Sequence, residues 1–380
     1  MVKYKLGDIC EIVSGSTPKT SVENYWDGDI KWITPAEIND DTYIINDSVR
    51  KITELGVKKT GLSPFPEGTI ILSSRAPIGK VAIAGCEMYC NQGFKNLICS
   101  DKIYNKYLYW FLKGNTAFLN SLGRGATFKE ISKAIVSEIE INVPNIEHQK
   151  EAVGALEKVS GVISLRKQEL SALDDLIKAR FVEMFGDPIL NPKGYDKESI
   201  KKHINLLSGY PFKSGQYVED GVNICGGLII MPQKIKWEEC VHWSSTDGYE
   251  EYMLDENDIV MALDRPWISE GFKIAKVDGE HLPALLIQRT ARIRAIDINQ
   301  DYLYYSFIHG GFDRHSNVTG SLVPHISAKD INSFEVMLPP IEIQNQFAAF
   351  VQQVDKSKFI DIINLLKILL FFKRGMYYGN

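Results

Sequence analysis

Side chains that can donate hydrogen bonds to a nucleic acid gather in three short segments of the first half of the chain. These segments read SSRAPIGK (73–80), NQGFK (91–95) and GRGATFKEIS (123–132). Arginine can donate two hydrogen bonds to O6 and N7 of guanine, and glutamine can pair in the same way with adenine. Paired glycines let a backbone approach a phosphate closely. If the partner is DNA, the predicted contacts are Arg75, Lys80, Gln92, Lys95, Arg124, Thr127 and Lys129.

The second half of the chain carries comparable segments, which read LDRPWISEGFK (263–273), IQRT (287–290) and DRHSNVTGSLVPHIS (313–327). An ordinary surface charge or a strand-end hydrogen bond is the alternative interpretation of each donor. In ARIRAI (291–296) the arginines alternate with apolar residues, which favours a strand surface over DNA reading. The predicted DNA contacts here are Arg265, Trp267, Lys273, Gln288, Arg289, Arg314, His315, Ser321 and His325, together with Lys19 and Lys213 near the start of each half.

Motifs for catalysis are missing from the sequence. SRAPIGKV (74–81) resembles the end of a phosphate-binding loop, but Ser74 and Val81 stand where that loop requires glycine and Ser or Thr. There is no G-x-G-x-x-G and no G-x-S-x-G. The seven histidines are dispersed, LDEND (254–258) is typical of a turn, and Cys86 and Cys90 have no zinc-like partners. We predict no catalytic residue and no metal site.

The elements that position these donors occur twice. VPNIEHQ (143–149) returns as LPPIEIQ (338–344), LGDICEIVSG (6–15) as IKKHINLLSG (200–209), and IYNKYLYWFL (103–112) as INQDYLYYSFI (298–308). The offset stays near 195 residues, which indicates two copies of one large unit. Strand-like segments such as GTIILSS (68–74) and NDIVMAL (257–263), mixed with short helical ones, predict a mixed α/β fold for each copy.

A long helical segment follows each copy, at 146–185 and at 341–380. In the first, apolar residues recur every seven positions from Leu156 to Met184, which is typical of a helix packed along another helix. The alternative is that each helix lies on its own globular domain. We predict that the two helices pair through Leu156, Val159, Ile163, Leu170, Leu173, Ile177, Val351, Val354, Leu365 and Ile368.

Charge and hydropathy restrict the partners of the chain only weakly. The net charge of −5 argues against a nucleic acid, but residues 186–340 alone, with 15 basic and 22 acidic side chains, account for the acidic balance. Any DNA-binding face must therefore be local. The start of the chain lacks the apolar core of a signal peptide, and the longest apolar run, at 362–372, is too short to span a bilayer. We expect a cytoplasmic protein.

Taken together, the motifs resemble the specificity subunits of type I restriction–modification systems over the full length of the chain. The opening segment LGDICEIVSGSTPKTSVENYWDGDIKWITPAEI has the family's Gly-x-Thr-Pro (Gly15, Thr17, Pro18) and Tyr-Trp (Tyr25, Trp26). The second opening, LLSGYPFKSGQYVEDGVNI, is similar to an alternative form in the same family. The family's Glu-Gln pair after the proline turn departs here to His148–Gln149 and Ile343–Gln344.

The resemblance implies an α+β fold: two target recognition domains (1–145 and 186–340) in a pseudo-twofold repeat, held apart by two spacer helices (146–185 and 341–380) that form an antiparallel coiled coil. It also implies a non-catalytic subunit in which each domain reads half of a bipartite site on double-stranded DNA. The helices would set the spacing and dock two methyltransferase subunits, and restriction subunits would join through these. The methyl donor, ATP and Mg²⁺ would then bind to the partner subunits. The alternatives are a duplicated protein–protein scaffold and a self-contained DNA-modifying enzyme.

Overall fold

The computed structural model describes residues 1–39, 41–125, 129–315 and 324–377, with the backbone alone at 359–361 and 363–377. The chain divides into two compact units. Unit 1 comprises residues 1–167 with 363–380, and unit 2 comprises residues 168–362. The predicted domain limits fall at helix ends, whereas each compact unit includes part of a long helix. The assignment of target recognition domains to 1–145 and 186–340 stays a prediction.

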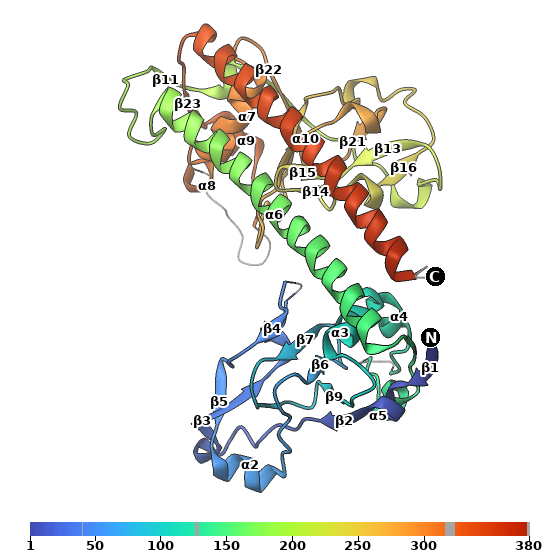
Figure 1. The fold of residues 1–380 in the computed structure, drawn as a ribbon. Helices are drawn as coiled ribbons and strands as arrows, with labels where there is room; N and C mark the ends of the chain where they lie inside the picture. Colours follow the sequence, from blue (N-terminus) through green and yellow to red (C-terminus); the bar gives the residue numbers. More distant parts are fainter. Residues whose placement is uncertain (40, 126–128, 316–323, 378–380) are drawn as a thin grey trace. The chain divides into compact units, whose positions relative to one another are not determined.

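Unit 1 is built on a five-stranded sheet of order β2-β9-β6-β7-β4 beside a three-stranded sheet of order β5-β3-β8. Its helices are α1 (Leu6–Ile9), α2 (Glu54–Thr60), α3 (Asn105–Gly114), α4 (Thr116–Ser121) and α5 (Lys133–Ser137). Figure 1 shows residues 1–167 of this unit from blue to green. Its strands are β1 (Val2–Lys5), β2 (Cys10–Ser14), β3 (Trp26–Ile33), β4 (Ile44–Ile45), β5 (Arg50–Ile52), β6 (Ile70–Leu72), β7 (Val81–Ala84), β8 (Tyr89–Cys90), β9 (Lys95–Cys99) and β10 (Glu140–Val143).

Unit 2 repeats this topology with four strands instead of five in its larger sheet. Its sheets have the orders β12-β22-β17-β20 and β16-β13-β21, and its short helices are α7 (Gln300–His309), α8 (Phe312–His315) and α9 (Ala328–Asn332). Its strands are β11 (Lys197–Ser199), β12 (Ile204–Ser208), β13 (Val222–Cys225), β14 (Ile230–Met231), β15 (Lys234–Ile235), β16 (Val241–Trp243), β17 (Ile259–Ala262), β18 (Trp267–Ile268), β19 (Gly271–Phe272), β20 (Ile274–Lys276), β21 (Ala284–Leu286), β22 (Thr290–Ala295) and β23 (Glu335–Met337).

The correspondence of the two units extends to single pairings. Strand β3 pairs antiparallel with β5 and parallel with β8, as β13 does with β16 and β21. The hydroxyl of Tyr107 donates to the carbonyl of Asn142 at 3.1 Å, and that of Tyr302 donates to the carbonyl of Met337 at 2.8 Å. Both members of the second pair lie 195 positions after those of the first. The predicted internal duplication and the mixed α/β fold are confirmed.

The glutamine that both proline turns share has one structural role in both copies. The carboxamide of Gln149 is fully buried, accepts from the backbone N–H of Tyr104 at 2.7 Å and donates to the carbonyl of Pro144 at 2.9 Å. Gln344 accepts from the N–H of Asn299 at 2.9 Å and donates to the carbonyl of Pro339 at 2.8 Å. Each glutamine therefore ties the first turn of a long helix to the start of α3 or α7.

The long helices are α6 (Ile146–Phe185) and α10 (Ile341–Tyr377). Within unit 2 they run antiparallel side by side, because Phe181 meets Phe347 at 5.5 Å between ring centroids while Asp174 pairs with Lys358 at 2.5 Å (Figure 1). Among the helices in the described part of the chain, none is both long and apolar enough to cross a membrane.

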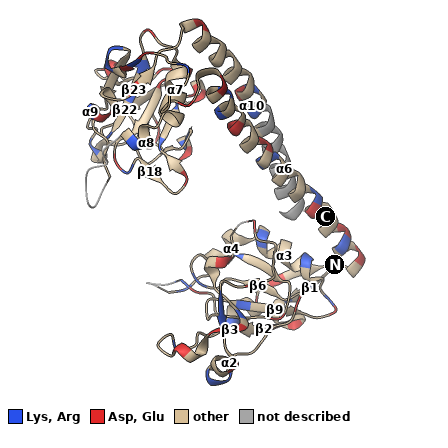
Figure 2. Ribbon diagram, turned by 90° about the vertical axis from the view of Figure 1, so that its left-hand side faces the viewer, with Lys and Arg blue, Asp and Glu red and all other residues tan. Residues whose placement is uncertain are grey.

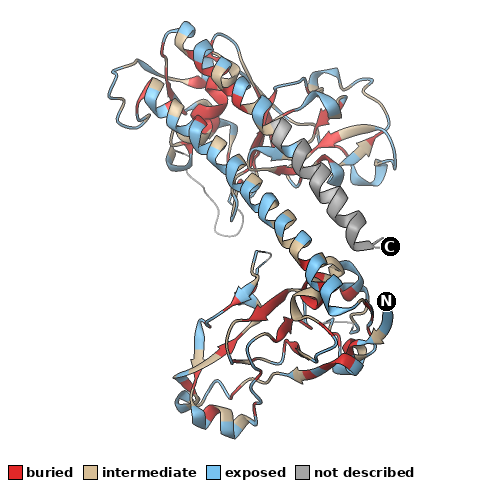
Figure 3. Ribbon diagram, viewed as in Figure 1, coloured by how far each residue is buried: buried red, intermediate tan, exposed pale blue. Residues whose placement is uncertain are grey.

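The predicted helix-pair residues fall into three groups. Ile177, Val351 and Val354 are buried in the core of unit 2, and the partly buried Leu173 packs against them. Leu156 instead packs against the core of unit 1, as the alternative interpretation expected. Val159, Ile163 and Leu170 are half-buried along a helix whose other faces are exposed, and the side chains of Leu365 and Ile368 lie outside the described residues (Figure 3).

Candidate nucleic-acid interface

In unit 1, the carboxylate of Glu130 forms ion pairs with two of the predicted DNA-contacting residues near the end of β6. Arg75 Nε lies 2.9 Å from Glu130 Oε2, and Lys95 Nζ lies 3.2 Å from Glu130 Oε1. Lys95 Nζ also donates to the hydroxyl of Ser74 at 3.3 Å. Arg124 is brought to the same place because its N–H and carbonyl exchange hydrogen bonds, both 3.0 Å, with the backbone of Glu130. We call these four residues, Arg75, Lys95, Arg124 and Glu130, the first basic cluster.

The backbone holds the first basic cluster together. The N–H of Ile131 donates to the carbonyl of Ser74 at 2.9 Å, and the N–H of Ser74 donates to the carbonyl of Gly93 at 2.7 Å. Partial burial by itself would raise the pKa of Glu130, but the hydrogen bonds and charges of Arg75 and Lys95 outweigh it and lower that pKa. The carboxylate therefore stays ionised at neutral pH.

The other donors predicted in unit 1 are less uniform. Lys19, Gln92 and Lys129 are exposed, and Gln92 accepts a hydrogen bond from the hydroxyl of Thr17. Lys80 is half-buried and donates to the carbonyl of Pro35 at 3.0 Å. The side chain of Lys95 is only 9% exposed, because Lys95 is the first residue of β9 and its side chain pairs with Glu130. Thr127 lies outside the described residues.

Unit 2 has a carboxylate at the equivalent position. Asp264 Oδ2 lies 3.1 Å from a guanidinium nitrogen of Arg289, and Asp264 Oδ1 lies 2.7 Å from Nδ1 of His325. Again the backbone holds the pair, because the N–H of Ile326 donates to the carbonyl of Leu263 at 2.8 Å. The N–H of Leu263 donates to the carbonyl of Arg289 at 2.9 Å. Asp264, Arg289 and His325 form the second basic cluster.

Arg289 in this cluster and Arg265 beside it have left-handed backbones, with φ of 64° at Arg289 and 46° at Arg265. This conformation is uncommon outside glycine and asparagine and costs energy that the surrounding structure must offset. The N–H of Arg265 donates to the carbonyl of Pro324 at 2.9 Å, which helps to hold it there. Both side chains are exposed. The strained backbone thus directs two guanidinium groups to solvent next to Asp264.

Lys273, like Lys95, is a predicted DNA contact whose side chain is buried in the structure. It is 6% exposed and donates to the carbonyl of Gly227. Burial, and then the charge of Arg265, lowers the pKa of its ammonium group. In the structure this donor is thus buried, and its contact with DNA stays a prediction. The half-buried Trp267 stacks on Phe272 with ring centroids 5.0 Å apart.

The remaining donors of unit 2 lie in several places. Gln288, next to Arg289, is exposed, as are Lys213 and Arg314. His315 is directed to α9, with Nε2 3.0 Å from the hydroxyl of Ser333 and 3.2 Å from the carbonyl of Asp330. These contacts of His315 involve α9 and the residue after it, and they do not involve Asp264. Ser321 falls outside the described residues.

The sequence interpretation missed the carboxylates that organise both clusters. Glu130 and Asp264 stand inside the quoted segments GRGATFKEIS and LDRPWISEGFK. The hydrogen-bond pattern makes Arg75 equivalent to Asp264, and Glu130 equivalent to His325. The sign of charge is therefore exchanged across the same pair of positions. An alignment of the two copies contains that exchange, so the signal was present in the sequence.

Arg292 corrects a second prediction, whereas Arg294 keeps a partly exposed side chain, at 33%, on β22. Arg292 is not on the strand surface: it is 6% exposed and donates to the carbonyls of Glu251 and Met253, both at 3.0 Å. Arg294 pairs with the buried Asp258 through Nε at 2.5 Å. The LDEND segment is the turn that the sequence predicted, and these arginines brace it against β22.

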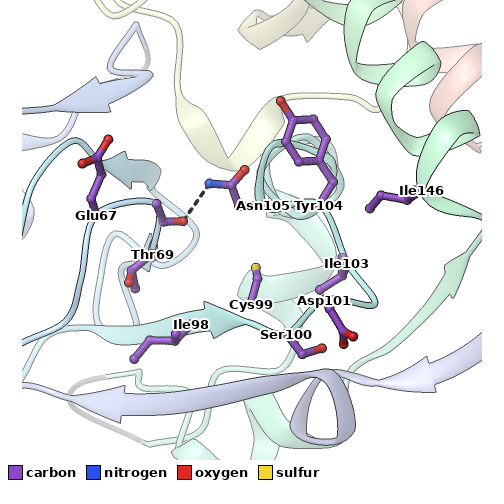
Figure 4. A pocket seen from close by; sticks show the side chains of 11 residues that line it. Glu67, Thr69, Ile98, Cys99, Ser100, Asp101, Ile103, Tyr104, Asn105 and Ile146 are labelled. Atoms are coloured by element: carbon purple, nitrogen blue, oxygen red, sulfur yellow. Dashed lines mark hydrogen bonds between the residues drawn. The ribbon is translucent and has the colours of Figure 1, made fainter.

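A pocket of about 350 Å³ lies in unit 1 at the other end of the β6–β9 pair from the first basic cluster (Figure 4). Its lining comes from residues 67–69, 98–101 and 103–105 and from Ile146. Asn105 crosses it to donate to the carbonyl of Gly68 at 2.9 Å.

Among the described residues, no group of three or more His, Cys, Asp or Glu could hold a metal ion. Figure 2 shows basic and acidic residues interspersed over both units.

Comparison with known proteins agrees with this duplicated architecture. The family model described as "Type I restriction modification DNA specificity domain" matches residues 1–174 and 220–369. The type I restriction enzyme MjaIX specificity subunit of Methanocaldococcus jannaschii is 29% identical, over 97% of this chain and 89% of that protein.

Two solved structures have a similar fold. The crystal structure of a type I restriction–modification system S subunit from M. genitalium aligns with a TM-score of 0.53 and 14% identity, over 99% of this chain and 94% of that one. A chain from a study of complex assembly and conformational transition of the type I R-M system aligns with a TM-score of 0.57 and 16% identity, over 99% and 96%. At these identities the likeness concerns the fold alone.

Proposed function

The chain belongs to the type I restriction modification DNA specificity family, and on that premise we propose that each of its two repeats reads one half of a bipartite site on double-stranded DNA. It is a specificity subunit with two target recognition domains. The observation that carries the proposal is the presence of one basic cluster at the equivalent end of the central sheet in each repeat. Two equivalent contact surfaces on one chain suit two half-sites on one duplex.

Within each half-site, the two kinds of contact have separate tasks. The exposed arginines Arg124 and Arg289 within the clusters, and Arg265 beside the second cluster, are suited to fork onto guanine edges. Exposed lysines such as Lys19, Lys129 and Lys213 are suited to phosphates, which position a protein without carrying sequence information. The buried Lys95 and Lys273 support loops and do not contact bases directly.

The long helices supply the second part of the proposal. They dock two methyltransferase subunits, and restriction subunits join through these. The chain itself is non-catalytic, and the methyl donor, ATP and Mg²⁺ bind to the partner subunits. The sequence supports this division, because it contains none of the motifs for binding a dinucleotide or nucleotide.

A map of methylated adenines in the host genome, with and without the gene, tests the function. We expect one bipartite motif, two short blocks that flank a fixed gap, to lose methylation when the gene is deleted. Replacing residues 1–145 by the corresponding domain of another member of the family should then change one block and leave the other intact. A scaffold that does not read DNA would leave both blocks unchanged after the replacement.

A further inference from the structure

The charge exchange between the two basic clusters has a physical consequence. In unit 1 the loop after β6 supplies the cation, Arg75, and the facing segment supplies the acid, Glu130. In unit 2 the loop after β17 supplies the acid, Asp264, and the facing segment supplies the basic partner, His325. The two copies have exchanged both members and kept the contact between a carboxylate and a basic side chain. In both copies, therefore, the loop after the central strand is joined to the facing segment by a contact between an acidic and a basic side chain.

Electrostatics alone gives no reason to retain a carboxylate on a DNA-binding face. A carboxylate repels phosphates and lowers the electrostatic attraction on which non-specific binding depends. An exposed ion pair also adds little stability, typically 1 kcal/mol or less. Yet each carboxylate here holds two basic side chains, Arg75 with Lys95 or Arg289 with His325. These carboxylates are also only about a third exposed, at 33% for Glu130 and 29% for Asp264.

We propose that Glu130 and Asp264 are positioning residues of the two half-site readers. Each carboxylate holds its basic partners in one geometry before DNA binds. It also orients a neighbouring arginine, which is Arg124 opposite Glu130 and Arg265 after Asp264. Pre-organisation reduces the side-chain entropy that is lost on binding, and it also directs the guanidinium fork toward one base edge. The negative charge meanwhile weakens binding to DNA of other sequences. This inference rests on the proposed function and assigns specificity to two acids that need not touch a base.

The decisive quantity is the ratio of affinities for cognate and non-cognate DNA. If Glu130 were only a repulsive surface charge, E130Q would strengthen binding to both DNAs in parallel and leave their ratio unchanged. A positioning residue behaves differently. E130Q should strengthen non-cognate binding and weaken cognate binding, so that the ratio falls by about tenfold or more, the discrimination typical of one good base contact.

The experiment uses the complex of the full chain with its methyltransferase subunits and duplexes that carry the mapped motif, with either half-site scrambled. E130Q should reduce discrimination at one half-site only, and D264N at the other half-site only. E87Q and E256Q are the matched controls, because they remove exposed carboxylates from the same units outside the clusters. Both controls should keep the wild-type ratio. Thermal unfolding of every variant checks the fold, and if E130Q unfolds, D264N decides the question by itself.

The outcomes separate this inference from the function on which it rests. A wild-type complex without any preference for the mapped motif would overturn the proposed function. A wild-type complex that discriminates, with E130Q and D264N that discriminate equally well, would overturn the positioning role alone. Loss of discrimination at both half-sites in each variant would also overturn it, because a general loss of structure would then be the cause.

Discussion

At the scale of the residue, the solvent exposure of each donor separates those that can reach DNA from those that support a loop. Lys95 and Lys273 have the right chemistry for a phosphate, but each donates its hydrogen bond inside the protein. Arg265 and Arg289 have the same charge, yet their left-handed backbones place them at the surface. Residue type alone therefore does not identify a DNA contact. The position of the residue in the fold decides whether its charged group is buried or exposed to solvent.

His309, on α7, leads to a prediction about pH. Its ring stacks on Tyr305 and meets the edge of Phe181, both at 5.8 Å between centroids. Burial, and then the charge of Lys178, lowers its pKa from 6.5 to about 4. The folded state thus binds fewer protons than the unfolded chain between these values. The stability due to neutral His309 is complete above pH 6.5 and is lost as the pH falls toward 4.

We expect the free energy of unfolding of unit 2 to fall by about 1–2 kcal/mol between pH 7 and pH 5 because of His309. Urea unfolding at both pH values measures the change, and H309F should remove that part of the pH dependence. The exposed His148 provides the control, because H148F should leave the pH dependence as it is in the wild type. Equal pH dependence in H309F and the wild type would show that the neutral imidazole is not the cause.

At the scale of the element, both long helices begin in the same way. Their first turns are tied to α3 or α7 by a buried glutamine, and the spacing of the partners is identical in the two copies. A proline turn ends β10 or β23 and sends the chain into the helix, while the glutamine sets the position of that helix on its unit. The carboxamide thus secures the first turn of each helix on its own globular unit.

Replacement of Gln149 or Gln344 by alanine should therefore destabilise the corresponding unit. Each change leaves a buried backbone N–H and a buried carbonyl without their partner, at a cost of about 2–4 kcal/mol. Thermal or urea unfolding measures the loss. Q353A removes an exposed glutamine from α10 and should be nearly neutral. If Q149A and Q344A were as stable as Q353A, the carboxamide would not be what secures the helix.

At the scale of the whole molecule, the duplication gives one chain two equivalent recognition surfaces and two long helices. Two readers on one duplex must match its helical repeat of about 10 bp, so that their spacing is part of the specificity. One added heptad lengthens a helix by about 10 Å, which corresponds to about three base pairs.

Insertion of seven residues after Asp174 in α6, and of seven before Lys358 in α10, should therefore lengthen the unread gap of the methylated motif by about three base pairs. Both half-sites should stay as they are. Methylome sequencing of a strain with the altered subunit measures the gap. An insertion in α6 alone serves as the control, because it breaks the pairing of Asp174 with Lys358 and should abolish methylation rather than shift it. A functional double insertion with an unchanged gap would mean that the helices do not set the spacing.

The sequence by itself determined the elements and their duplication. Periodicity, proline turns and β-branched runs are local properties of the chain, so the helices at 105–114 and 146–185 and the strands around residues 71 and 260 could be predicted from them. The tertiary structure decided which side chains meet. Glu130 reaches Arg75 across 55 positions, and Asp264 reaches His325 across 61. Such encounters depend on strand register and on the approach of distant segments, and no local pattern encodes either.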